Sequence, residues 1–165
     1  MIPEHRIDRQ RYWLAYFFDG MPVGAQFKPG ALHLTIITWF VVDIDEKDLL
    51  DSFKSTFKNT KSFDVKTGEL VRFGPKKDVP VRLLQSSETV MNLHRRALDW
   101  FEQINARWAV KDPHAGPGYM PHIRQREENK LAAGEVVRIN SLSIVKARRR
   151  EDDIRTVAEK VVFDE

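Results

Sequence analysis

The chain has 165 residues, of which 42% are hydrophobic and 31% are charged, a balance typical of a globular protein with a single sizeable core. It contains no cysteine, which excludes disulfide bonds, thiolate metal sites and a cysteine nucleophile, and fits a reducing compartment. The net charge of +3 is compatible with anionic partners but does not require them.

No segment predicts secretion or membrane insertion. Residues 1–6 lack the apolar stretch of a secretory signal, and no apolar run approaches the roughly 18 residues of a membrane span. We therefore expect a cytoplasmic monomer that does not contact membranes, folded as one domain over residues 1–165.

The first part of the chain predicts two strands followed by a helix. Residues 1–10 are polar and are expected to form a loose arm, whereas Arg11–Phe18 is rich in the aromatic residues typical of strands. Turn residues follow, and a second strand is expected at Leu32–Val42. A helix is then expected to begin after Asp45. Its apolar residues, at helical spacing, are Leu49, Leu50, Phe53 and Phe57.

Short extended segments and a long helix occupy the middle of the chain. Phe63–Lys66 and Leu70–Phe73 are predicted strands separated by a turn at Gly68, and Val79–Leu84 is a further predicted strand. Apolar residues then recur at a period of about 3.6 residues over Val90–Trp108, which predicts a helix of about five turns.

The last part of the chain predicts mostly strands. A loop rich in glycine and proline at Lys111–Gly118 precedes the segment Tyr119–Arg124. One long strand is predicted at Val136–Lys146, and a charged turn at 148–153 leads to a final strand over Ile154–Phe163, part of which could also be helical. Strands joined by short turns and interleaved with two helices predict an α+β fold with largely antiparallel sheets.

Two short segments carry residues suited to phosphate chemistry. In a strand the side chains of residues i and i+2 share a face, so His33 and Thr35 should point the same way. The segment Pro121-His122-Ile123-Arg124 has the same arrangement, with an arginine in place of the threonine. Two histidines can supply the acid and the base of phosphodiester cleavage near neutral pH, while Thr35 and Arg124 bind the phosphate oxygens.

These motifs resemble, in sequence and order, those of the two-histidine phosphoesterases, which include 2′-5′ RNA ligase-like proteins and RNA 2′,3′-cyclic phosphodiesterases. The likeness extends over most of the chain, including the aromatic first strand, Phe73-Gly74-Pro75 before a strand, and the Tyr-x-Pro-His entry to the second motif. It implies a bilobed fold in which two antiparallel sheets face each other across a V-shaped cleft, with helices outside and His33 opposite His122. It also implies metal-independent hydrolysis of 2′,3′-cyclic phosphates on RNA ends or nucleotides, without a cofactor.

Arg124 departs from the family, which usually has threonine or serine at this position. Strand parity still directs Arg124 into the cleft, where we expect it to bind phosphate and, as a neighbouring cation, to disfavour protonation of His122. His122 would then be the general base and His33 the general acid. The same substitution favours an alternative, a non-catalytic relative that binds nucleotides or RNA ends.

Five further residues are candidates for substrate contact. Tyr119, Trp39 and Phe40 could stack on a base, and Arg126 and Lys28 could contact phosphates. The other histidines lack metal-ligand spacing, so no metal site is predicted, and the lack of a glycine-rich phosphate loop argues against a nucleoside-triphosphate-driven ligase. A third alternative, an unrelated RNA-binding domain, would require an RNP-type aromatic strand, which the sequence lacks.

Overall fold

A computed structural model describes residues 10–85, 88–110, 118–147 and 154–165. Its strands are β1 (Arg11–Phe17), β2 (Gln26–Phe27), β3 (His33–Val41), β4 (Phe63–Phe73), β5 (Val79–Gln85), β6 (Arg107–Trp108), β7 (His122–Arg124), β8 (Val136–Ile139), β9 (Ser141–Ala147) and β10 (Arg155–Val162). Its helices are α2 (Glu46–Phe57) and α3 (Glu88–Gln103). Almost all of the expected N-terminal arm and of the loop at 111–118, and the whole charged turn at 148–153, lie outside the described residues.

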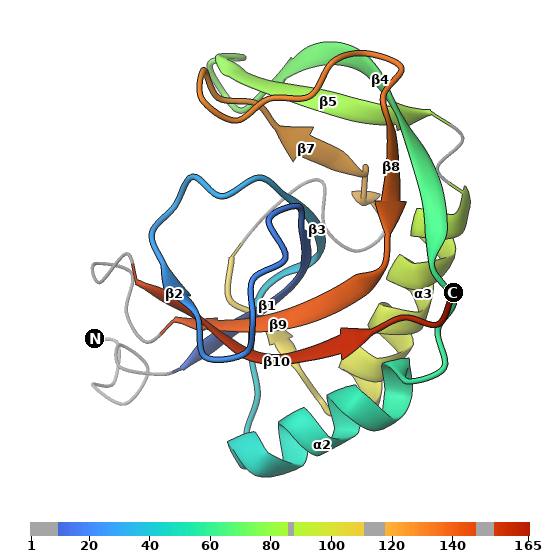
Figure 1. Cartoon of the computed structure of the whole chain (residues 1–165). Coiled ribbons are helices and arrows are strands. Elements are labelled where there is room, and N and C mark those ends of the chain that lie inside the picture. Colours follow the sequence, from blue (N-terminus) through green and yellow to red (C-terminus); the bar gives the residue numbers. More distant parts are fainter. Residues whose placement is uncertain (1–9, 86–87, 111–117, 148–153) are drawn as a thin grey trace.

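The strands form two antiparallel sheets, with the orders β2-β10-β9-β1-β3-β6 and β7-β5-β4-β8. Figure 1 shows the second sheet above the first, with both helices on the outside of the molecule. The first sheet is built mainly from the two ends of the chain, and the second sheet from its middle. This arrangement confirms the predicted α+β class with antiparallel sheets, and it places the two histidine motifs on different sheets.

β3 carries the first histidine motif on a strand whose alternation is interrupted. His33 and Thr35 are partly exposed, and Leu34 between them is fully buried, as strand parity predicts. Further along, the pairing with β1 shifts register twice, and each shift places one extra residue on β3. As a result, two consecutive residues, Thr38 and Trp39, both line the cavity described below.

β1 is buried on both faces because it separates two apolar clusters. The larger cluster is the main core, and its largest fully buried rings are those of Phe40, Phe53, Phe57 and Trp100. The smaller cluster lies on the side of the sheet that carries His33, and its buried residues are Trp13, Ala15, Phe17 and Val145. A strand that is apolar on both faces explains the continuous aromatic run seen in the sequence.

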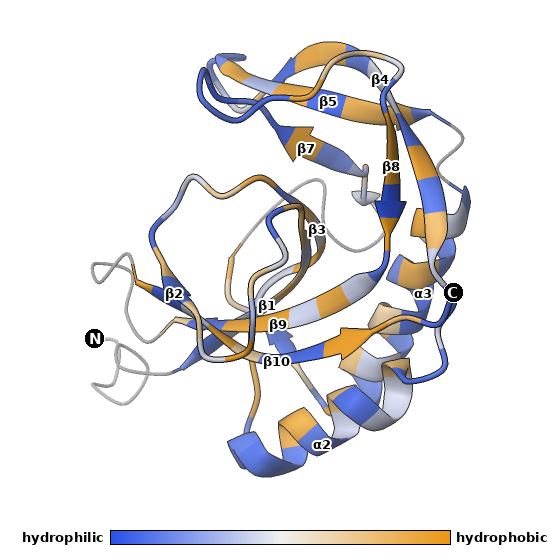
Figure 2. Cartoon of the chain, in the orientation of Figure 1, coloured by the Kyte–Doolittle hydropathy of each residue, from blue (hydrophilic) through white to orange (hydrophobic). Residues whose placement is uncertain are grey.

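Both helices are amphipathic, and hydrophobic and hydrophilic residues alternate along their ribbons in Figure 2. α2 begins after Asp45, as predicted, and buries Leu49, Phe53 and Phe57. α3 packs against β3 and so supports the strand that carries the first motif. Within the described ranges, neither helix is long and apolar enough to cross a membrane.

α3 is shorter than its apolar periodicity predicts. The helix ends at Gln103 because Asn105 adopts a left-handed backbone conformation, with φ of 53°, which closes the last turn. Trp108 is therefore not helical, which corrects the prediction. It lies in β6, where its ring stacks on that of Phe101 with centroids 4.3 Å apart. The apolar period continued to Trp108 because the chain returns to the same apolar surface.

Two predicted strand boundaries are also wrong. Gly68 does not turn the chain, since β4 passes through it with a shift in register, and a Cβ at this position would lie 3.2 Å from the carbonyl oxygen of Leu83. The strand predicted at Val136–Lys146 is two strands, β8 in the second sheet and β9 in the first. The chain crosses between the sheets at Asn140, where two successive polar residues, Asn140 and Ser141, shift the apolar positions from odd to even numbers. The single predicted strand overlooked this break in the alternation.

Candidate active site

His33 and His122 are held in the same way at the starts of β3 and β7. Nδ1 of His33 lies 2.8 Å from the carbonyl oxygen of Ala31, and Nδ1 of His122 lies 2.8 Å from the carbonyl oxygen of Met120. A carbonyl oxygen only accepts hydrogen bonds, so Nδ1 must carry the proton in each ring. Nε2 is therefore the nitrogen of each ring that is left to exchange a proton with a ligand: it accepts a proton when the ring is neutral and donates one when the ring is protonated.

Each imidazole also packs against the edge or face of an aromatic ring. The ring centroids of Trp13 and His33 lie 4.8 Å apart, with an interplanar angle of 62°. The ring centroids of Phe73 and His122 also lie 4.8 Å apart, with an interplanar angle of 61°. Neither Trp13 nor Phe73 was predicted as a site residue. Strand parity could have indicated Trp13, because it shares a face of β1 with Phe17, the residue that pairs with His33.

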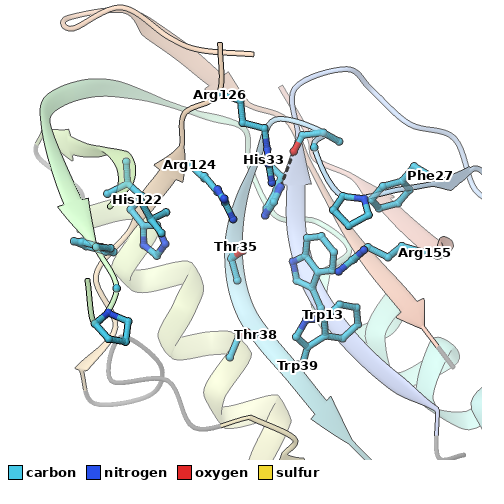
Figure 3. Close-up of a pocket in the computed structure, with 18 residues that line it drawn as sticks. Trp13, Phe27, His33, Thr35, Thr38, Trp39, His122, Arg124, Arg126 and Arg155 are labelled. Atoms are coloured by element: carbon cyan, nitrogen blue, oxygen red, sulfur yellow. Dashed lines mark hydrogen bonds between the residues drawn. The ribbon is translucent and has the colours of Figure 1, made fainter. Parts of the chain in front are cut away.

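The two imidazoles line one cavity of about 790 Å³ (Figure 3). Figure 3 shows His122 on one side and His33 on the other, with the Arg124 side chain and Thr35 between them. All four residues that the sequence predicts for catalysis and phosphate binding therefore lie in one site, drawn from both sheets.

The cavity is positively charged. Arg126 and Arg155 line it together with Arg124 and the two histidines, and none of the described residues that line it is acidic. Guanidinium groups form strong, paired hydrogen bonds with phosphate oxygens. The composition of the cavity wall is therefore suited to an anionic ligand such as a phosphoester.

The imidazole of His33 is difficult to protonate. Burial lowers the pKa of His33 to about 4, the hydrogen bond to Ala31 opposes this shift, and the positive charges of His122, Arg126 and Arg155 add to it. At neutral pH the ring is uncharged and can accept a proton at Nε2. This state argues against the general-acid role that the sequence led us to expect for His33.

Tyr119 supports the site without lining the cavity, which corrects its prediction as a substrate contact. Its hydroxyl donates to the carbonyl oxygen of Thr35 at 2.7 Å, and its ring stacks on that of His94 with centroids 3.7 Å apart. His94 in turn donates from Nδ1 to the carbonyl oxygen of Ile36 at 2.8 Å. Burial raises the pKa of Tyr119, so its hydroxyl keeps the proton that links the entry of β7 to β3.

Trp39 lines the cavity, but neighbouring side chains surround its ring. The Cζ atoms of Arg11 and Arg155 lie 5.2 and 5.5 Å from its centroid, and the Trp13 ring packs against it at 5.1 Å. A substrate base would therefore meet Arg155 alongside Trp39. No sequence signal points to Arg155, because β10 reaches this wall only through the order of strands in the first sheet.

Two other candidates lie outside the site. Phe40 is fully buried in the main core against Trp100, so it cannot stack on a base. Lys28 is exposed and does not line the cavity, although residues on both sides of it do. Among the residues that the structure describes, no group of three or more His, Cys, Asp or Glu side chains could hold a metal ion.

Solved structures share this fold. The crystal structure of TT0787 of Thermus thermophilus is 17% identical, with a TM-score of 0.63 over 92% of this chain and 97% of that chain. E. coli LigT complexed with phosphate is 12% identical, with a TM-score of 0.60 over 96% and 99%. E. coli LigT complexed with 3′-AMP is 11% identical, with a TM-score of 0.59 over 94% and 99%.

The family assignment rests on the sequence as well as on the fold. A comparison with curated proteins gives no significant match. The sequence profile of the 2′-5′ RNA ligase superfamily, by contrast, matches residues 4–146, which include both histidine motifs. The chain therefore belongs to the 2′-5′ RNA ligase superfamily, the two-histidine phosphoesterases that the paired motifs resemble.

Proposed function

We propose that this chain is a phosphodiesterase that hydrolyses 2′,3′-cyclic phosphates of nucleotides or RNA ends, with His33 and His122 as the acid–base pair. The observation that carries the proposal is the matched geometry of the two imidazoles, each bonded through Nδ1 to a backbone carbonyl and each lining the same cavity. The superfamily assignment supports phosphoester chemistry. The complexes of LigT with phosphate and 3′-AMP support a ligand of the nucleotide type.

The reacting phosphate is proposed to lie between the two imidazoles. Thr35 would donate its hydroxyl to one non-bridging oxygen, and Arg124 would donate two N–H groups to the phosphate. Both side chains lie between the histidines in Figure 3, which is where these contacts are needed. Arg124 carries a full positive charge, so it would also stabilise the extra negative charge that develops on the phosphate in the transition state.

His33 is proposed as the general base and His122 as the general acid. Nε2 of His33 takes a proton from water as the water oxygen bonds to phosphorus. The bond from phosphorus to a ribose oxygen breaks, and that oxygen receives a proton from Nε2 of His122. The low pKa of His33, which leaves its ring uncharged at neutral pH, supports this assignment. Because the two imidazoles supply both proton transfers, we propose that no metal is needed, and activity should survive a chelator.

The nucleoside is proposed to lie along the wall formed by Trp39 and Arg155. The Arg155 guanidinium lies 5.5 and 5.9 Å from the ring centroids of Trp39 and Trp13, so two indoles support it. A guanidinium supported in this way can stack on a base without selecting among bases.

The test is a phosphorus NMR assay of 2′,3′-cyclic nucleotides, which reports both turnover and the position of the product phosphate. Replacing either histidine should lower kcat/KM by about 10² to 10⁴, so we compare His33→Ala and His122→Ala with the wild type, with and without EDTA. Lys28→Ala removes an exposed cation beside the cavity and serves as the control. Equal activity in the wild type and both histidine variants would remove the proposal.

The assignment of acid and base has its own test. A nucleoside p-nitrophenyl phosphodiester has a leaving group that needs no proton, so it should restore much of the activity of His122→Ala and little of that of His33→Ala. The reverse pattern would identify His33 as the acid.

A second candidate function is binding without turnover. The departure at Arg124 favours it, since a cation in place of the usual hydroxyl strengthens phosphate binding. Submicromolar binding of a cyclic nucleotide with no product after long incubation would establish this alternative and exclude the hydrolase.

A further inference from the structure

The cavity carries more positive charge than one reacting phosphodiester requires. The phosphodiester has a single negative charge, which Arg124 and one protonated imidazole already offset. Arg126 and Arg155 also line the cavity, and no described acidic residue does. Two guanidiniums are therefore left over, and a cluster of cations at the wall of a cavity favours a ligand with more than one anionic group.

Arg126 has a fixed backbone close to the first motif. Its N–H donates to the carbonyl oxygen of Asn129 at 2.9 Å, and the N–H of Asn129 donates back at 3.2 Å, so residues 126–129 form a closed turn. The Asn129 side chain donates to the carbonyl oxygen of Gly30 at 2.9 Å, which ties this turn to the loop that precedes His33. The position of Arg126 relative to His33 is therefore set by both segments.

The guanidinium of Arg126 is placed beside the reacting centre and not within it. Figure 3 shows its side chain next to His33, whereas Arg124 lies between the two histidines. The Arg126 guanidinium makes no hydrogen bond or ion pair with any residue that the structure describes. Arg155 differs, because its guanidinium packs over the indoles of Trp13 and Trp39. Arg126 is thus the cation with donors available for another phosphate.

We propose that Arg126 binds a second phosphate of the substrate, carried on the 5′-oxygen of the ribose that bears the cyclic phosphate. This inference rests on the proposed function and narrows its substrate class to compounds with phosphate at both ends of the terminal ribose. The 5′-phosphate can be a free monoester or the diester that links the preceding nucleotide of an RNA. Both present anionic oxygens at the same place, and the experiment separates them.

The experiment compares kcat/KM for three substrates: adenosine 2′,3′-cyclic phosphate, the same compound with a 5′-phosphate, and the dinucleotide ApA ending in a 2′,3′-cyclic phosphate. The wild type should prefer one or both of the last two by about 10-fold to 100-fold, the range of one hydrogen-bonded charge pair. Preference for the second compound alone identifies a monoester ligand, and preference for the dinucleotide identifies RNA.

The variants assign the preference to a residue. Arg126→Ala should lose most of the preference for substrates with a 5′-phosphate, and Arg126→Lys should keep part of that preference. Lys130→Ala removes an exposed cation from the same loop and should keep the full preference. Equal kcat/KM for the three substrates in the wild type would overturn the inference while leaving the proposed function intact. So would a preference that survives Arg126→Ala, or one that is lost in Arg155→Ala instead.

A binding measurement separates failure of the inference from failure of the proposed function. Dissociation constants for the same three compounds are measured by calorimetry with His33→Asn, with and without Arg126→Ala in the same chain. The compounds with a 5′-phosphate should bind more tightly, and Arg126→Ala should remove that gain. If the wild type turns over none of the three compounds, the proposed function fails, and these constants alone support or overturn the role of Arg126.

Discussion

The protonation of His33 provides a prediction that needs no substrate. Its pKa is lowered from 6.5 to about 4, mainly because the partly buried ring loses much of the hydration that stabilises its charged form. The pKa of His33 is lower in the folded chain than in the unfolded chain, so the unfolded chain binds more protons at pH values between the two. The free energy of unfolding therefore decreases as the pH falls from the unfolded-state pKa to the folded-state pKa. The whole difference between the two pKa values corresponds to about 3 kcal/mol in the free energy of unfolding. About 2 kcal/mol of this should be lost between about pH 7 and about pH 4.5.

His33→Asn isolates this contribution. The asparagine Nδ2 can donate to the carbonyl oxygen of Ala31 in place of the imidazole Nδ1, so the variant keeps the local hydrogen bond without a titrating group. Urea unfolding is followed by circular dichroism at several pH values for both proteins. Between about pH 7 and about pH 4.5, the free energy of unfolding of the wild type should fall by about 2 kcal/mol more than that of the variant.

The titration can also be observed directly. NMR of the His33 ring should give a midpoint near 4, well below the ordinary value of 6.5. Parallel stability curves for the wild type and His33→Asn, together with an NMR midpoint near 6.5, would show that burial does not disfavour the charged ring. The assignment of His33 as the base would then lose its support.

Three further substitutions test the framework of the site. Tyr119→Phe removes the donor to the Thr35 carbonyl, so urea titrations should show the free energy of unfolding lower by about 1 kcal/mol; an unchanged value would mean that water replaces the bond. Phe73→Ala removes the ring packed on His122 and should lower kcat by about 10-fold with a smaller effect on KM, whereas a change in KM alone would indicate a substrate contact. Arg124→Thr restores the residue usual in the family and should raise KM for cyclic phosphates by about 10-fold and alter the pH–rate profile; if both stay unchanged, Arg124 does not contact the reacting phosphate.

The residues proposed for catalysis are predictable from the sequence because they depend on local rules. Side chains alternate along a strand, so His33 and Thr35 had to share a face, and the same rule directed Arg124 into the cavity beside His122. The α+β class likewise followed from short turns between strands, which join antiparallel neighbours. The two motifs, together with the features that accompany them along the chain, indicated the superfamily that the sequence profile over residues 4–146 confirms.

Changes of direction within an apolar pattern misled the prediction. The apolar period of α3 runs on to Trp108 although the helix ends at Gln103. The alternation of β8 and β9 slips by one residue at Asn140 and Ser141, where the chain passes from one sheet to the other, and the prediction of one strand overlooked that slip. Periodicity shows which side of a segment is apolar, but it does not reveal a turn after which the chain returns to the same apolar surface.

The surroundings of the histidines were decided only by the tertiary structure. Arg155 reaches the cavity because β10 is placed in the first sheet by its pairing with β9, and no local pattern encodes that pairing. The low pKa of His33 has the same origin, since it depends on burial and on the charges of Arg126 and Arg155, which come from distant parts of the chain. The sequence by itself therefore determined which groups could exchange protons with a phosphate, and the packing of remote segments decided which of them is uncharged and what surrounds it, because burial and electrostatic fields are set by distances in space.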